Sequence, residues 1–207
     1  MSTDTAEFTA PATAASLETI AERLRERNFE TLIVDTAEQA HDEVMKRVPD
    51  GAEVHSAKSK TLEDIGVFKE LMDSERHDFL RKKLFKMDRA TQAREMRKLV
   101  SAPDFELGSV NAITEAGQMV VTSASGSQIG PYGGSAGNLI LVVGSQKIVP
   151  DLDTAIRRIN DHVFPYEDAR LREQMGVGTK VARILILERD YVPGRTTVIL
   201  VREPVGV

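Results

Sequence analysis

The chain has 207 residues, of which 41% are hydrophobic and 29% are charged. These values fit one soluble globular domain, because a chain of this length buries enough surface to form a core without metal or disulfide support. Cysteine is absent, which excludes disulfides, thiolate catalysis and cysteine-bound zinc or iron–sulfur clusters within the chain. The net charge of -5 argues against general nucleic-acid binding, and no apolar run is long enough for a membrane helix.

The segment from Met1 to Ala15 is rich in Ser, Thr and Ala, and it lacks the basic and apolar regions of a signal peptide. We interpret it as a disordered tail in front of a single domain over residues 16–207. The missing cysteines are compatible with a reducing compartment, so we expect a cytoplasmic protein.

The first half of the domain alternates between strand and helix signals. Apolar residues recur at helical spacing over residues 16–28, and residues 31–35 form a short apolar run typical of a buried strand. Thr36 opens a capping-box pattern, which predicts a second helix. A strand over residues 52–56 and a helix beginning at Thr61 follow. This order implies parallel strands connected by crossover helices.

The segment from Glu75 to Val100 is highly charged and predicts one or two helices on an outer face. A solvated helix surface is its simplest interpretation. The alternatives are the rim of an anionic-ligand site and a docking face for a partner. The residues that make it locally basic are Arg81, Lys82, Lys83, Lys86, Arg89, Arg94, Arg97 and Lys98.

The second half of the domain has a different pattern. A strand, a turn and a strand are predicted over residues 111–122, and residues 138–143 form a continuous apolar run typical of a buried strand. Asp151 is positioned to cap a further helix. Two strand-like runs, 181–188 and 196–202, flank a Pro-Gly turn and predict a C-terminal antiparallel hairpin, so we expect a mixed sheet.

The segment after the second strand is the first candidate site. Lys58, Ser59, Lys60 and Thr61 lie between a strand end and a helix start, where unpaired backbone N–H groups and cations can hold a carboxylate or phosphate. Ordinary capping by Thr61, with two exposed lysines, explains the same residues.

Glu115 is the candidate catalytic residue. It lies at a strand–turn–strand corner two residues before Gly117, where a carboxylate could act as a general base or a nucleophile. A hairpin with a solvated Glu is the alternative.

The third candidate is the Gly/Ser-rich loop over residues 123–137, in which Ser125, Gly126 and Gly130 could bring backbone amides close to a ligand. It matches neither a Walker loop nor a G-x-G-x-x-G fingerprint, and a flexible lid or a strand crossing is the alternative. The histidines share no metal-ligand spacing, so we expect no metal site, and His55 is the one worth testing.

Taken in order, several segments resemble the LUD (lactate utilization) domain family. The resemblance spans about Leu17 to Val207. The segments that carry it are Ser56–Gly66, Asn111–Val121, Leu141–Val149, Asp151–Ile159 and Thr197–Glu203.

The resemblance implies a Rossmann-like α/β core of the ribose-5-phosphate isomerase and coenzyme A transferase-like type, with helices on both faces of the sheet. In that superfamily an Ile-Thr-Asp/Glu-x-Gly-Asn/Gln segment sits at the active site. The residues that fit this form are Thr114, Glu115, Gly117 and Gln118, and Asn111 precedes them in the matched segment.

The family's name comes from bacterial L-lactate oxidation operons, in which a LUD protein works beside iron–sulfur subunits. Some relatives carry a cysteine cluster where this chain has residues 176–182 without cysteine, so we expect no cofactor within the chain.

Three hypotheses about function follow. The first is an enzyme or binding subunit for a small anionic substrate, held by the lysine-rich segment with Glu115 as base or nucleophile. The second is a non-catalytic component of a lactate-oxidising iron–sulfur or flavin assembly, docked through the basic segment. The third, nucleic-acid binding by that segment, is disfavoured by the acidic total and the lack of interleaved aromatics. We also expect a homodimer, the commonest assembly.

Overall fold

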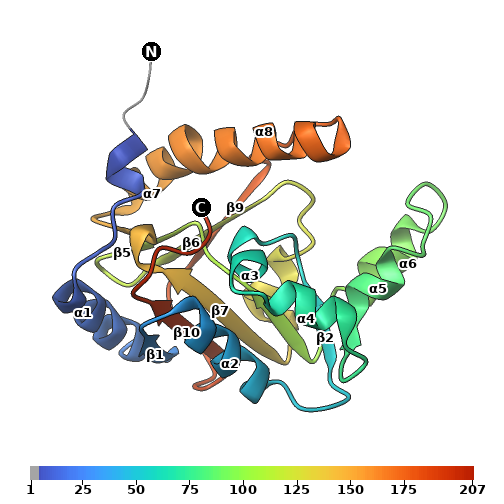
Figure 1. The fold of residues 1–207 in the computed structure, drawn as a ribbon, viewed down its shortest axis with the longest axis horizontal. Coiled ribbons are helices and arrows are strands. Elements are labelled where there is room, and N and C mark those ends of the chain that lie inside the picture. The colour runs from blue at the N-terminus through green and yellow to red at the C-terminus, as the bar shows by residue number, and fades with distance from the viewer. Residues whose placement is uncertain (1–4) are drawn as a thin grey trace.

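The computed structural model describes residues 5–207, which fold around two β-sheets (Figure 1). The central sheet has six strands in the order β1-β10-β7-β4-β2-β3, and every neighbouring pair is parallel. Its strands are β1 (Glu30–Val34), β2 (Glu53–Ser56), β3 (Asp78–Phe79), β4 (Phe105–Gly108), β7 (Asn138–Gly144) and β10 (Thr196–Val201).

The second sheet is mixed and has the order β8-β5-β6-β9. The strands β5 and β6 form an antiparallel hairpin, β9 extends it antiparallel to β6, and β8 pairs parallel to β5. Its strands are β5 (Ala112–Thr114), β6 (Met119–Ser123), β8 (Ile148–Val149) and β9 (Arg183–Leu187).

Several helices begin at a capping side chain. Thr36 and Gln39 form the reciprocal capping box of α2, and Asp151 accepts the backbone N–H of Thr154 to cap α7. The helices are α1 (Ala14–Arg25), α2 (Ala37–Arg47), α3 (Lys60–Asp64), α4 (Val67–Asp73), α5 (Leu80–Leu84), α6 (Ala93–Leu99), α7 (Leu152–Arg158) and α8 (Phe164–Met175). Short 3-10 or π turns are η1 (Thr5–Phe8), η2 (Pro131–Ser135), η3 (Ser145–Lys147) and η4 (Ile159–Val163).

The core is divided into layers by the two sheets. The helices α2, α3 and α4 cover one face of the central sheet, where Val44, Leu62 and Leu71 pack against Val142 and Ile199. The other face is covered by α1 and the second sheet. The helix α7 then packs on the outer face of the second sheet. The predicted α/β class with parallel strands and crossover helices is confirmed. The mixed pairing that was expected of one sheet lies in the second sheet, which covers much of a face where helices were expected.

The predicted C-terminal hairpin is wrong. The strands β9 and β10 do not pair: β9 joins β6 in the second sheet, whereas β10 lies between β1 and β7 in the central sheet. Burial explains the separation. Every residue of β10 is buried, as a strand covered on both faces requires, while β9 exposes Ile184 and Ile186 on an edge. The turn at Pro193-Gly194 therefore takes the chain from one sheet to the other.

In the segment predicted as a tail, Phe8 is buried against the fold, while most of the other described residues are exposed. Met1 to Asp4 lie outside the described residues. Phe8 is 3% exposed, and its carbonyl accepts a hydrogen bond from Arg158 Nη2 at 3.3 Å. No helix among residues 5–207 has the length and apolar character needed to cross a membrane.

Candidate functional site

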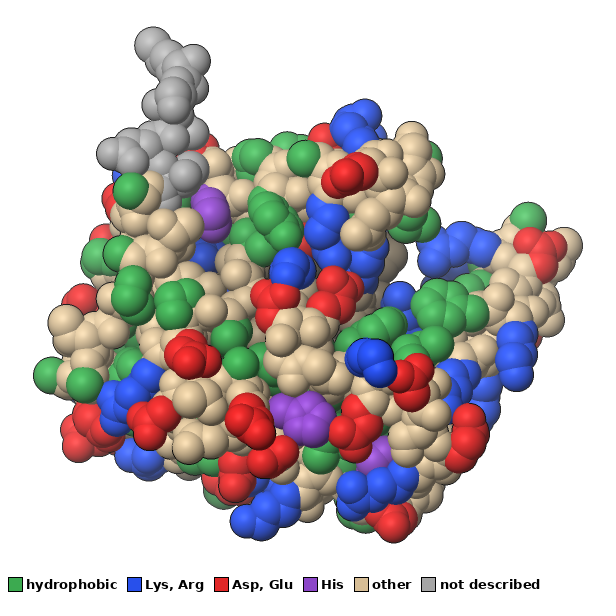
Figure 2. Space-filling view, viewed as in Figure 1, with side chains coloured by type: hydrophobic (Ala, Val, Ile, Leu, Met, Phe, Trp, Pro, Cys, Tyr) green, Lys and Arg blue, Asp and Glu red, His purple; other side chains and the backbone are tan. Residues whose placement is uncertain are grey.

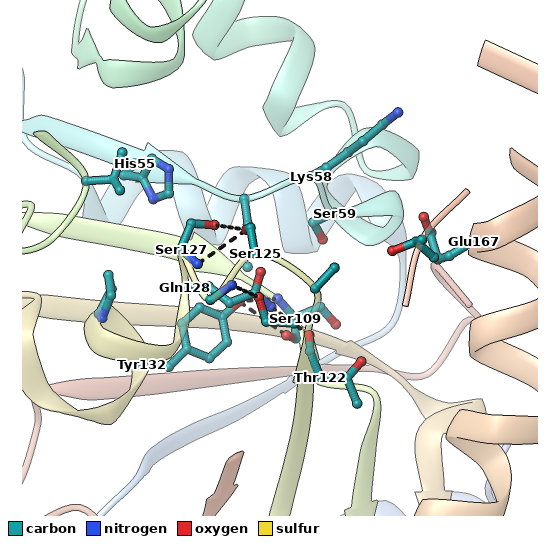
Figure 3. A pocket seen from close by; sticks show the side chains of 18 of the residues that line it. His55, Lys58, Ser59, Ser109, Thr122, Ser125, Ser127, Gln128, Tyr132 and Glu167 are labelled. Atoms are coloured by element: carbon teal, nitrogen blue, oxygen red, sulfur yellow. Dashed lines mark hydrogen bonds between the residues drawn. The ribbon is translucent and has the colours of Figure 1, made fainter. Parts of the chain in front are cut away.

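A cavity of about 980 Å³ opens at the carboxyl edge of the central sheet. Segments that directly follow three neighbouring strands line it: residues 57–61 after β2, residues 109–111 after β4, and Lys147 after β7. Ligands of open α/β sheets bind at this edge, because loops from adjacent parallel strands converge there. Figure 3 shows Ser59, Ser109 and Thr122 close together, with Glu167 facing them from α8.

The cavity lining is cationic in an acidic chain. Glu167 is the one acidic side chain among its described lining residues, whereas seven are basic. Figure 2 shows the hollow between α8 and the α5–α6 arm, with Lys and Arg side chains on its rims. A cavity of one sign concentrates ions of the other sign. The basic lining residues are Lys58, Lys60, Arg81, Arg89, Arg97, Lys147 and Lys180.

The lysine-rich segment does reach the cavity, but its helix is short. Ser59, rather than Thr61, caps α3 by accepting the backbone N–H of Leu62, and α3 has only five residues. Lys58 donates to the Gln174 side chain at 2.5 Å, and Lys60 pairs with Asp64. Since so short a helix has little dipole, the side chains supply most of the positive charge.

Lys147 is the most deeply placed cation of the cavity. Its side chain is 3% exposed, and Nζ lies 2.9 Å from Thr61 Oγ1 and 3.1 Å from Ser109 Oγ. No carboxylate among residues 5–207 forms an ion pair with it. Burial, with the nearby Arg158 guanidinium, lowers the pKa of Lys147 to about 7.

Tyr132 fixes the strand end that presents Ser109. Its hydroxyl accepts from the backbone N–H of Ser109 and donates to the Ser109 carbonyl, both at 3.2 Å. Gly108 makes this approach possible, because a Cβ there would lie 1.7 Å from the tyrosine oxygen. Burial raises the pKa of the Tyr132 hydroxyl, so it stays protonated.

A buried His–Glu pair forms another part of the wall. His55 on β2 and Glu106 on β4 are directly paired across the two strands, and Nδ1 lies 2.6 Å from Oε2. Burial raises the pKa of Glu106 in spite of the bond to His55. His55 lines the cavity, while the second carboxylate oxygen of Glu106 is buried without a hydrogen-bond partner among residues 5–207.

The structure brings most of the sequence-predicted residues together. Asn111 orients the end of β6, because its Oδ1 accepts from the Thr122 backbone N–H at 2.6 Å. The Gly/Ser-rich loop passes over the same space (Figure 3). The predicted residues that line the cavity are Lys58, Ser59, Lys60, Thr61, Asn111, Ser125, Gly126 and Gly130.

Glu115, Thr114 and Gly117 lie elsewhere. They belong to the tip of the β5–β6 hairpin, whereas the cavity contacts the opposite end of that hairpin at Asn111 and Thr122. The Glu115 side chain is exposed, and Gly117 packs against arginines of the α1 end. Glu115 is therefore outside the group of residues that could act together in the cavity.

Sequence reasoning did not select Lys147, Tyr132 or Glu106. Lys147 follows a continuous apolar strand, and a single cation at the end of such a run is the signal that could have drawn attention to it. Glu106 is likewise a single charged residue, here within the otherwise uncharged segment Phe105–Gly108.

The comparisons with known proteins agree with this architecture. The LUD domain model matches residues 17–201, so the chain belongs to the LUD domain family. A DUF162 family protein from Deinococcus radiodurans superposes with a TM-score of 0.52 at 15% identity, covering 92% of this chain and 99% of that chain. D-Ribose-5-phosphate isomerase in complex with phospho-erythronic acid gives a TM-score of 0.37 at 16% identity, covering 62% and 66%. Among curated proteins, none matches the sequence.

Proposed function

We propose that the chain binds a small anionic metabolite, a carboxylate or a phosphate, in the cavity at the carboxyl edge of the central sheet. The observation that carries the proposal is the cationic lining, with Lys147 buried at its base without a carboxylate partner among the described residues. A buried ammonium is costly unless it is paired, and a bound anion would supply the missing partner.

Family membership suggests a lactate-utilization-type protein, which makes lactate and pyruvate the first probes. Both are small carboxylates that the hydroxyls of Ser59, Thr61 and Ser109 could orient. Glu115 has no part in this proposal, because its exposed side chain lies outside the cavity.

A thermal-shift titration with phosphate, lactate and pyruvate at constant ionic strength tests the proposal. A ligand at about 100 times its Kd adds roughly 2.7 kcal/mol, which should raise Tm by about 5–10 °C for a domain of this size. Lys58→Met should weaken the response, because Lys58 lines the cavity. Lys69→Met, which removes an exposed lysine of α4, and Glu115→Gln should leave it unchanged. If no probe raised Tm, or if Lys58→Met and Lys69→Met reduced the rise in Tm equally, the proposed site would be contradicted.

A second proposal, a non-catalytic component of a lactate-oxidising iron–sulfur or flavin assembly, is favoured by the α5–α6 arm. The arm projects from the body (Figure 1), Phe85 is 63% exposed, and α6 has no buried residue. Affinity capture of the full chain should recover iron–sulfur or flavin subunits, and Phe85→Ser should reduce the yield. Capture that is unaffected by Phe85→Ser would contradict docking through the arm.

A further inference from the structure

The side chain of Lys147 differs from the other buried cations of the protein. Arg170 is also buried, but it pairs with Glu63 and Glu167 at 2.9 Å. Arg158 donates to the backbone carbonyls of Asn111 and Phe8. Among the described residues the Lys147 amine has hydrogen bonds to two hydroxyls and no ion pair, and Lys147 lines a cavity large enough for a metabolite.

We propose that Lys147 is a covalent catalytic residue, whose amine condenses with the carbonyl of a small 2-oxo carboxylate bound in the cavity to form an imine. This inference rests on the proposed anion site, and it narrows the substrate class from any small anion to one that carries a reactive carbonyl. A lysine attacks a carbonyl only as the neutral amine, and burial beside a second cation is a known way to obtain that form.

The surroundings of Nζ fit this role. Ser109 Oγ lies 3.3 Å from the Val110 carbonyl and can donate its proton there, which leaves its oxygen free to accept from Nζ. Thr61 Oγ1, in the first turn of α3, accepts a second hydrogen bond from Nζ. Burial and Arg158 lower the pKa of Lys147 to about 7, so a large share of the amine is neutral near neutral pH.

The reaction needs no oxidant, reductant or further co-reactant. The Nζ lone pair forms a bond to the carbonyl carbon, and the carbonyl oxygen takes up a proton as the nitrogen loses one. In the resulting carbinolamine the nitrogen lone pair forms the C=N bond while the hydroxyl group leaves as water with the remaining N–H proton, and a proton from solvent then gives the protonated imine. Asp64 and Glu167 partly oppose the lowering of the Lys147 pKa, and Glu167 lines the cavity, so its charge would favour the protonated imine.

Borohydride trapping tests the proposal on the unaltered full-length chain. The protein is incubated with pyruvate or glyoxylate and sodium borohydride, and the adduct is then located by peptide mass mapping. Lys147 should be labelled at least about a hundredfold faster than the exposed Lys69, because its neutral fraction near neutral pH is larger by two to three orders of magnitude. Lys147→Arg should remove the adduct, whereas Lys69→Met should retain it.

Two outcomes would overturn the proposal: no adduct, or adducts spread over surface lysines without preference for Lys147. The adduct is mapped on the unaltered chain, so the test does not depend on whether Lys147→Arg folds. Lactate and phosphate, which lack a reactive carbonyl, separate the two proposals. If these ligands raised Tm but borohydride trapped no adduct, the anion-site proposal would stand and the imine proposal would be contradicted. The absence of both would contradict the site itself.

Discussion

At the residue scale, Lys147 combines burial with a position at the base of a cavity. The groups that bear on its charge come from three helices: Arg158 of α7 lowers its pKa, while Asp64 of α3 and Glu167 of α8 raise it by smaller amounts than burial lowers it. A change at any of these positions should therefore move the titration of the amine. The neutral form is stabilised by the fold as a whole and not by one neighbour.

This depressed pKa predicts a pH-dependent stability. The unfolded amine keeps a pKa near 10.4, so between about pH 7 and 10 the unfolded chain binds more protons than the folded chain. The free energy of unfolding contributed by Lys147 therefore rises with pH over this window. Lys147→Met should be stabilised relative to the parent at pH 7 and lose that advantage towards pH 10. Urea titrations across the range measure it, with Lys69→Met as the control. If the free energy of unfolding changed with pH in the same way for the parent and Lys147→Met, the lowered pKa of Lys147 would be contradicted.

At the element scale, β2 and β4 are joined by the buried His55–Glu106 pair as well as by their backbone ladder. Both strands end at the cavity, so the pair sets the spacing of the loops that carry Lys58 and Ser109. A buried ion pair adds little net stability over well-packed apolar residues, but removing one partner leaves the other without compensation.

We therefore predict a strongly coupled double-mutant cycle. His55→Leu should lower the free energy of unfolding by about 3–5 kcal/mol, because Glu106 is left buried and unpaired. The double variant His55→Leu/Glu106→Met should recover part of this loss. Urea unfolding at neutral pH measures all members of the cycle. A double variant no more stable than His55→Leu would show that the pair is not the source of the loss.

Local signals predicted the elements much better than their pairing. The capping box at Thr36 and the cap at Asp151 involve groups within three residues, so the sequence contains all that is needed to recognise them. Burial across the whole fold decides which strand pairs with β9. A Pro-Gly turn is a local signal and contains no information about that burial. The same limit applies to Glu115: the hairpin was predicted, but which of its ends meets the cavity depends on how the second sheet lies against the central one.

At the scale of the whole molecule, the start of the chain is held by residues about 150 positions later. Phe8 is buried against the η4 region, its ring centroid lies 6.1 Å from that of His162, and Arg157 stacks over it at 5.4 Å. The Phe8 carbonyl also accepts a hydrogen bond from Arg158 Nη2, while Arg158 Nη1 donates to the carbonyl of Asn111 next to the cavity.

Phe8→Ala should consequently lower the free energy of unfolding by about 3 kcal/mol, since a buried aromatic ring is removed. Glu7→Ala is a matched control. Glu7 pairs with Arg157 at 3.0 Å, but both side chains are about half exposed, so the loss should stay below about 1 kcal/mol. Equal effects of the two substitutions in urea unfolding would indicate that the segment contributes no more than a surface contact.

The position of β10 has a consequence for how the protein is made. It is the last strand of the central sheet in chain order, yet it lies between β1 and β7. While the ribosome is still synthesising the chain, β1 therefore has no neighbour, and one edge of β7 stays open until Thr196–Val201 emerges. Strands from nearly the full length of the chain must then assemble at once, which favours slow folding and leaves apolar edges exposed to other nascent chains in the meantime.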